Sequence, residues 1–252
     1  MMKFHDEALD EMAGAKSSAK RRINKTILRI LTLADAYRSY GDEFSFDVVP
    51  EFDEEVDRIL IEMSDGLLQD AEKRARKLLA MLELEEEEMD EIIGESESGE
   101  NGLQWAIDMH ASNLKALLGV WIAIMFAKGL SVNKAFTQVI GYMESPESSP
   151  LWKEVVRARI VDPNEVRFGR GYQRRIPDAV GVLLQTFIYT AFARGYITKG
   201  RKDGAIGYRT FRQSNYDCEL CDSLTTRVWP IDELVIPAHQ RCVCGIELVY
   251  PD

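Results

Sequence analysis

The chain has 252 residues, of which 46% are hydrophobic, so it can bury a proper core and needs no metal to stabilise it as a whole. Residues 1–25 are polar and charged, so no secretory signal peptide is expected. The most apolar stretch, residues 116–127, has 12 residues where a bilayer span needs about 20, so no membrane-spanning helix is expected. We therefore expect a soluble protein made in a reducing cytoplasm.

The net charge of −11 is unevenly distributed along the chain. Residues 1–150 contain 16 basic and 30 acidic residues, a balance of −14, while residues 151–252 contain 15 and 12, a balance of +3. Within the second part, residues 166–212 contain ten basic residues and only two acidic ones. The two ends could therefore meet different partners, although solvated surfaces would give the same pattern.

The first 200 residues are predicted to be mainly helical. Apolar residues recur at intervals of three and four from Ile23 to Ala34, and again from Phe52 to Leu78. Between these stretches, residues 44–48 alternate and could form a short strand or an extended connection. His5 is expected to lie in a frayed terminus.

Residues 85–102 form an acidic, turn-rich stretch with few apolar residues, which predicts a flexible loop. A long apolar helix is expected over residues 103–128, with His110 on its polar start, at the surface or in a capping role. Gly129 should stop this helix and Ser131 should cap the next one.

Residues 143–150 are rich in proline and serine and indicate a linker, followed by a short helix at 151–160. A further helix should open at Ile176 and stop at Gly195. After residue 204, β-favouring residues occur in short runs. We therefore predict an α+β protein: an acidic helical domain at 1–145, a linker and basic helical segment at 146–203, and a small antiparallel β module around a zinc site at 204–252.

All four cysteines lie in the last 35 residues, in two motifs separated by 17 residues. The first is Cys218-Glu-Leu-Cys221 and the second is His239-Gln-Arg-Cys242-Val-Cys244. Thiolates and an imidazole at this spacing are typical of a tetrahedral zinc site, so four of these five residues are predicted to hold zinc.

The fourth zinc ligand stays open between two residues. One possible set is Cys218, Cys221, His239 and Cys242, because Cys244 on a strand is expected to point away from Cys242. In the other set, Cys244 replaces His239. A closed structural site is favoured over a catalytic one, since the region has a single histidine to move protons. No phosphate-binding loop, dinucleotide fingerprint or nucleophile elbow is present, so we expect no enzyme activity.

The tail resembles a known family of viral proteins. Three segments of the tail resemble the C-terminal module of phage head morphogenesis proteins, the Mu F-like minor capsid family. They are the run from Gly207 through the two cysteines of the first motif, then Val228-Trp229, and then Ile236-Pro237-Ala-His239 with the last two cysteines. The resemblance is specific over residues 204–249 and loose over residues 176–202. Gln240 and Thr225-Thr226 depart from the proline and glycine turn that are common in the family.

The resemblance implies a portal-associated minor capsid protein inside the virion of a tailed phage or prophage, present in the host cytoplasm during assembly. Such a protein aids head assembly and DNA packaging or ejection, with portal and capsid proteins as partners and neither a membrane nor a small-molecule substrate. Packaged DNA could meet the basic segment through non-specific phosphate contacts. The alternative is a zinc-ribbon nucleic-acid-binding protein. In either case the candidate phosphate-binding residues are Arg201, Lys202, Arg209 and Arg212.

Overall fold

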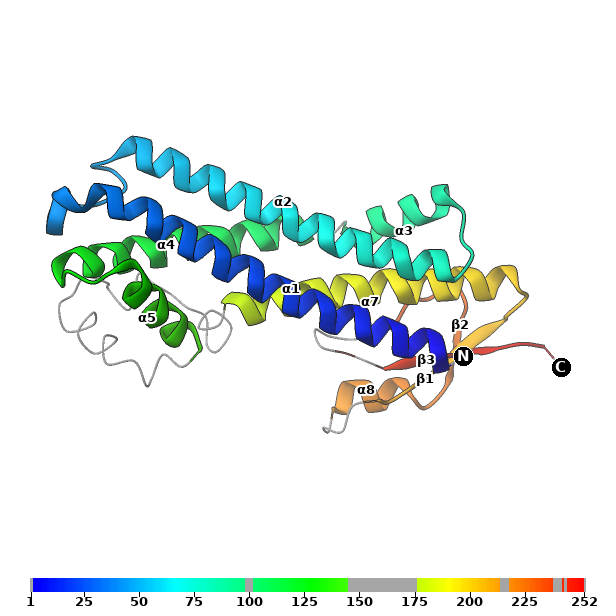
Figure 1. Cartoon of the computed structure of the whole chain (residues 1–252). Coiled ribbons are helices and arrows are strands. Elements are labelled where there is room, and N and C mark those ends of the chain that lie inside the picture. Colours follow the sequence, from blue (N-terminus) through cyan, green and yellow to red (C-terminus); the bar gives the residue numbers. More distant parts are fainter. Residues whose placement is uncertain are drawn as a thin grey trace. The chain divides into compact units, whose positions relative to one another are not determined.

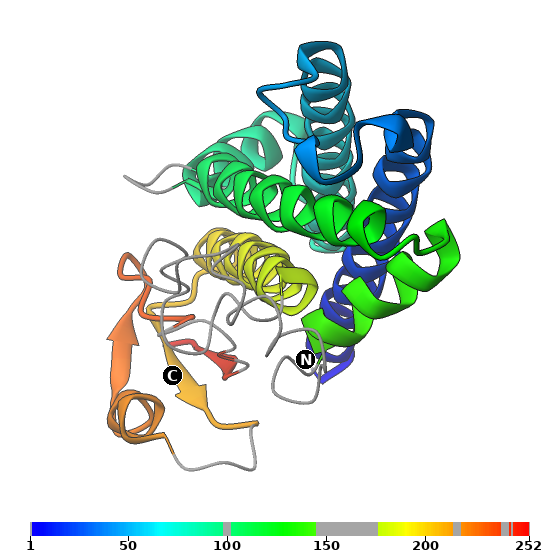
Figure 2. The same cartoon turned by 90° about the vertical axis from the view of Figure 1, so that its left-hand side faces the viewer.

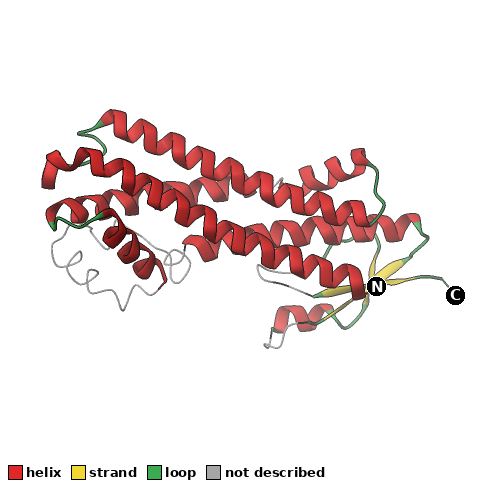
Figure 3. Cartoon of the chain, viewed as in Figure 1, coloured by secondary structure: helices red, strands yellow, loops and turns green. Residues whose placement is uncertain are grey.

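Helices make up most of the described residues, and the strands among them lie in the C-terminal part of the chain (Figures 1 and 3). The computed structural model describes residues 2–97, 102–144, 176–213, 218–237, 242 and 244–251. The helices are α1 (Met2–Ala34), the 3-10 helix η1 (Asp35–Glu43), α2 (Pro50–Met81), α3 (Glu86–Glu97), α4 (Leu103–Ala127), α5 (Val132–Glu144), α7 (Ile176–Lys202) and α8 (Glu219–Leu224). The strands are β1 (Gly207–Phe211), β2 (Val228–Pro230) and β3 (Gly245–Val249).

The three strands form one antiparallel sheet in the order β2-β1-β3. Tyr208 in the central strand pairs with Trp229 of β2 and Leu248 of β3. The β-favouring residues of the tail thus fall on the observed strands. The predicted fold class, a mostly helical protein with a small C-terminal antiparallel sheet, is confirmed.

The residues divide into two compact units, each built from separate parts of the chain. Unit 1 contains Met1–Ser18, Leu67–Ala106 and Gly181–Asp252, and unit 2 contains Ala19–Gly66 and Ile107–Val180. No single continuous stretch makes up either unit, and the three consecutive domains predicted from the sequence stay a prediction. The short helix predicted at 151–160 and most of the predicted linker lie outside the described residues.

Unit 2 has an apolar core made by helices and an aromatic cluster. Phe52 of α2 is fully buried and lies against the rings of Phe44, Phe46 and Tyr37, with centroids 5.3–5.7 Å apart. Residues 46–48 form a turn, so the alternation at 44–48 marks a connection and not a strand. The predicted end of α4 is confirmed, because Gly129 has a positive φ of 59°.

Unit 2 also confirms the predicted helix start at Ser131. The backbone N–H of Lys134 lies 3.4 Å from the Ser131 hydroxyl, and the N–H of Ala135 donates to the Ser131 carbonyl. These contacts satisfy donors that the first turn of α5 would otherwise leave without partners.

Unit 1 places α7 beside the sheet, and in both views the tail lies against this helix (Figures 1 and 2). The prediction that this helix stops at Gly195 is wrong, since α7 continues to Lys202. Gly195 is needed for packing, because a side chain there would collide with Leu79 of α2. The helix ends before Gly204, whose φ is +87°.

The acidic stretch after residue 85 is also more ordered than predicted. Residues 86–97 form α3, and the backbone N–H of Glu85 donates to the Glu88 carboxylate at 3.0 Å. Acidic side chains in the first turn stabilise a helix through its dipole. Ile92 and Ile93 are buried. The flexible-loop prediction is therefore wrong for residues 86–97, because two buried isoleucines and a capped start support a helix.

Two helices, α4 and α7, are long and apolar enough to cross a membrane by length and composition. Half of the most apolar window of α4 and 67% of that of α7 are buried inside the structure. The core helix of a soluble protein passes the same test, so length and composition do not distinguish the two cases.

Candidate metal centre

Three buried cysteine thiols converge in unit 1. The sulfur atoms of Cys221, Cys242 and Cys244 all lie within 4.8 Å of one another, and those of Cys221 and Cys242 are 3.9 Å apart. Two sulfurs that each lie about 2.3 Å from a tetrahedral zinc ion would be about 3.8 Å apart. The three thiols could therefore hold a metal ion.

Cys221 is positioned by the short helix α8. Cys218 is the N-cap residue of the helix, and its carbonyl accepts the N–H of Asp222 at 2.9 Å; the first turn places Cys221 on the buried side. At the other end, the Leu224 carbonyl accepts hydrogen bonds from the Trp229 indole and the Thr210 hydroxyl, both at 2.8 Å. Side chains from β2 and β1 thus fix α8 against the sheet.

Cys244 is positioned by β3 and by α7. It directly precedes Gly245, which pairs with Phe211 of β1, and a side chain at position 245 would collide with the Phe211 ring. The buried Tyr189 hydroxyl of α7 donates a hydrogen bond to the Cys244 carbonyl. The cysteine backbone is therefore held between the sheet and a core helix.

Tyr189 is a supporting residue that the sequence analysis did not identify. In the sequence it falls within the apolar pattern of residues 180–192, and no spacing rule connects it with a cysteine 55 residues later. Burial raises its pKa well above the ordinary tyrosine value. The hydroxyl therefore keeps its proton and remains a hydrogen-bond donor at neutral pH.

The Cys221 and Cys244 thiols keep their protons at neutral pH when no metal is bound. Burial raises the pKa of the Cys221 thiol to about 12. The pKa of Cys244 is also raised, first by its hydrogen bond with Cys242 and then by burial. A metal that binds here must displace these protons, so its affinity will increase with pH.

The structure corrects one prediction about the ligand set. Cys244 was expected to point away from Cys242, but their thiols lie together. The physical reason is the period of an extended chain, in which residues one apart face opposite sides and residues two apart share a side. Cys242 and Cys244 are two apart, so both can reach one ion.

Because the structure places Cys244 among the three converging thiols, the two predicted residues left for the fourth position are Cys218 and His239. Cys218 is half-buried and its thiol is within hydrogen-bonding reach of the Cys221 thiol, but it is not among the three that converge. His239 lies outside the described residues.

Three of the four predicted phosphate-binding residues pair with carboxylates of the protein. Arg201 lies 2.7 Å from Asp232, Lys202 lies 2.5 Å from Glu88, and Arg212 lies 2.7 Å from Asp222. Arg209 is exposed on β1 and makes no ion pair within the part of the chain that the structure describes. Internal carboxylates thus compete with phosphate at three of these positions, and a nucleic-acid contact stays a prediction.

Both remaining histidines are buried, contrary to expectation. His5 packs against the rings of Tyr189, Phe192 and Phe211, so the N-terminal turn of α1 is anchored and not frayed. His110 is 5% exposed and therefore not a surface residue. Burial lowers the pKa of both side chains, which makes the neutral imidazole the dominant form at pH 7.

Comparisons with known proteins found no match: no family model, no curated protein and no solved structure is similar to this chain at a significant level.

Proposed function

We propose that the protein is a minor capsid or head morphogenesis protein of a tailed phage or prophage, and that a structural zinc ion holds its C-terminal module together. It would lie inside the capsid near the portal and aid head assembly and DNA packaging or ejection. In this role the protein binds and positions other components and catalyses no reaction.

The observation that supports the proposal is the convergence of both cysteine motifs. Cys221 belongs to the first motif, and Cys242 and Cys244 belong to the second, 21 residues or more along the chain. The resemblance to the head morphogenesis family covers the same segment, residues 204–249. The viral assignment depends on this motif, because no family model matches.

Zinc is the metal that we propose for the site. Thiolates are soft ligands, and a closed set of four suits an ion that prefers tetrahedral coordination and has no redox chemistry. A structural role is favoured because the sequence of the module, residues 204–252, contains a single histidine that could move protons. Such a group would be needed to move protons in zinc catalysis.

The proposal is tested by quantifying the protein in purified particles from the organism that encodes it. Mass spectrometry before and after DNA release should find a few copies per particle. A loss on DNA release would add a role in ejection. Absence from otherwise complete particles would contradict the minor capsid role and favour the zinc-ribbon nucleic-acid-binding alternative.

A further inference from the structure

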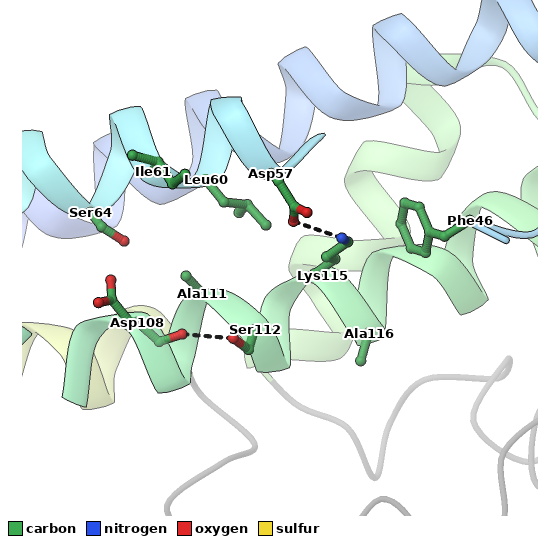
Figure 4. A pocket seen from close by; sticks show the side chains of 10 residues that line it. All are labelled: Phe46, Asp57, Leu60, Ile61, Ser64, Asp108, Ala111, Ser112, Lys115 and Ala116. Carbon is green, nitrogen blue, oxygen red and sulfur yellow. Dashed lines mark hydrogen bonds and ion pairs between the residues drawn. The ribbon is translucent and has the colours of Figure 1, made fainter. Parts of the chain in front are cut away.

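A cavity of about 540 Å³ lies between α2 and α4 in unit 2, and its lysine is paired within the protein (Figure 4). The Lys115 ammonium lies 2.6 Å from both Asp53 and Asp57, so it serves to hold the two helices together. The thiols, which are intrinsically strong nucleophiles, all lie in unit 1 instead.

The four thiols differ in how far solvent reaches them. Cys221, Cys242 and Cys244 are only 1–2% exposed, whereas Cys218 is half-buried. Cys218 is the N-cap residue of α8, so it lies just before the first turn, while Cys221 lies within that turn on the buried side. Because thiol oxidation follows exposure, a dissolved oxidant meets Cys218 first.

Cys221 connects this accessible thiol to the buried ones. The Cys221 thiol is within hydrogen-bonding reach of Cys218, and its sulfur lies 3.9 Å from that of Cys242. Cys218 is not among the three thiols that converge. The contact of the accessible thiol with the metal centre therefore runs through Cys221, at the Cys-x-x-Cys spacing of dithiols that exchange with disulfides.

We propose that Cys218 is a site of oxidation by hydrogen peroxide, and that Cys221 then forms a disulfide with it. In the first step the Cys218 sulfur attacks the peroxide. An S–O bond forms and the O–O bond breaks, and the thiol proton leaves with the other oxygen as water, so Cys218 becomes a sulfenic acid.

In the second step the Cys221 sulfur attacks the sulfur of oxidised Cys218. The S–S bond forms and the S–O bond breaks, and the hydroxyl group leaves as water with the proton of Cys221. The two thiols together lose two electrons, and these reduce one peroxide molecule to two molecules of water.

The disulfide removes Cys221 from the metal centre. Of the three converging thiols only Cys242 and Cys244 then remain, which is too few for the closed set of four that structural zinc requires. Oxidation therefore releases the metal, and reduction of the disulfide restores the site. This consequence rests on the zinc ion of the proposed function, whereas the oxidation of Cys218 does not.

The experiment treats the full-length protein with a single equivalent of hydrogen peroxide, blocks the remaining thiols with N-ethylmaleimide and maps tryptic peptides by mass spectrometry. Trypsin separates the two motifs, because residues 213–227 contain both cysteines of the first and residues 242–252 contain both of the second. We expect an internal disulfide in peptide 213–227 and two blocked thiols in peptide 242–252. A cross-link between the peptides, a disulfide within 242–252 or unchanged thiols would overturn the proposal.

Metal release is measured in parallel on zinc-loaded protein with a zinc-binding dye. The zinc released should increase in proportion to the disulfide in peptide 213–227, and dithiothreitol with added zinc should reverse both. A disulfide that forms without zinc release would overturn the link to the metal and the proposed zinc site, but not the oxidation of Cys218. The two failures are therefore distinguishable.

Variants identify the thiol that reacts first. Cys218→Ser should slow the loss of thiols to peroxide at least about tenfold, because only buried thiols remain. Ser223→Ala is the matched control on the same helix and should oxidise like the unchanged protein, since its hydroxyl bonds only to the Leu220 carbonyl. Equally fast oxidation of a folded Cys218→Ser protein would assign the reaction to a buried thiol and contradict the proposal. The peptide map of the unchanged protein stays decisive if this variant does not fold.

Discussion

Unit 2 and unit 1 obtain their stability in different ways. The described part of unit 2 consists of helices and their connections, and its core contains fully buried apolar and aromatic side chains such as Ile27, Phe52 and Leu114. Unit 1 combines helical segments with a three-stranded sheet and three buried thiols. A three-stranded sheet with two strands of five residues and one of three has little core of its own.

This difference indicates where a metal matters. A helical core built from large side chains is stabilised by burial of apolar surface. A small sheet whose loops converge on thiols gains from a metal, because metal binding contributes directly to folding. Loss of the metal should therefore affect unit 1, and loss of apolar contacts in unit 2 should leave the metal in place.

The largest effect is expected from Cys221→Ser. In zinc-finger peptides the metal contributes about 10–16 kcal/mol at neutral pH, so removing a central ligand should release the ion and unfold the sheet. The measurement is metal content by elemental mass spectrometry together with hydrogen exchange of residues 207–211. The matched control is Ser223→Ala on the same helix, whose hydroxyl bonds only locally to the Leu220 carbonyl. A Cys221→Ser protein that keeps its metal would show that the cluster is not the binding site.

The same measurement identifies the fourth ligand. If Cys218 is the ligand, Cys218→Ser should lower metal content as strongly as Cys221→Ser does, and His239→Ala should have little effect. The reverse result would assign the role to His239. Full metal content in both variants would mean that three thiols suffice.

Phe52→Ala should produce the next largest effect, in unit 2. Truncating a fully buried phenylalanine usually costs 3–5 kcal/mol, and Phe52 contacts a cluster of three other rings. Denaturant unfolding should show this loss while metal content stays unchanged. Exposed Ile61→Ala on the same helix serves as control. Loss of metal from the Phe52 variant would mean that the two units are not energetically separate.

The sequence predicted the parts of this comparison that depend on local patterns. Helical periodicity, the stop at Gly129 and the cap at Ser131 involve residues close together in the chain, and all three are confirmed. The strands of the tail and the metal-binding motifs are local in the same sense. Spacing alone was enough to identify Cys221 and Cys242 as partners.

The errors came from contacts between distant residues. Gly195 does not end its helix. The glycine is explained instead by packing, since a side chain at this position would collide with Leu79 of α2. His5 is buried because rings from α7 and β1 cover it. The contact between Tyr189 and Cys244 is likewise invisible in the sequence. The error about Cys244 was different, since the strand period itself places it beside Cys242.

Tyr189→Phe should have a smaller effect, confined to unit 1. It preserves the ring but leaves the Cys244 carbonyl without its donor, which costs about 1–3 kcal/mol for a buried group. The metal should stay bound, with lower affinity in a chelator competition assay. Tyr196→Phe, the same change seven residues later in α7, should alter metal affinity less. Equal effects of the two variants would remove Tyr189 from the support of the metal centre.

The smallest effect concerns pH, and it distinguishes the two buried histidines. Burial lowers the pKa of His110 in unit 2, so protonation is less favourable in the folded state than in the unfolded chain. Its contribution to stability is therefore complete above about pH 6.5, the value for an unperturbed histidine, and is lost as the pH falls below it. One such group changes stability by at most about 1.4 kcal/mol per pH unit.

His110→Met should therefore reduce the loss of stability of unit 2 between pH 7 and pH 5, measured by hydrogen exchange of residues 19–66. His5→Phe should do the same for unit 1 only, because His5 lies among the rings of that unit and burial is also the main cause of its lowered pKa. If either variant changed the pH profile of both units equally, acid sensitivity would be a property of the whole chain. If each variant changes only its own unit, the division that separates the part with the candidate metal centre from the apolar helical part also holds for proton binding.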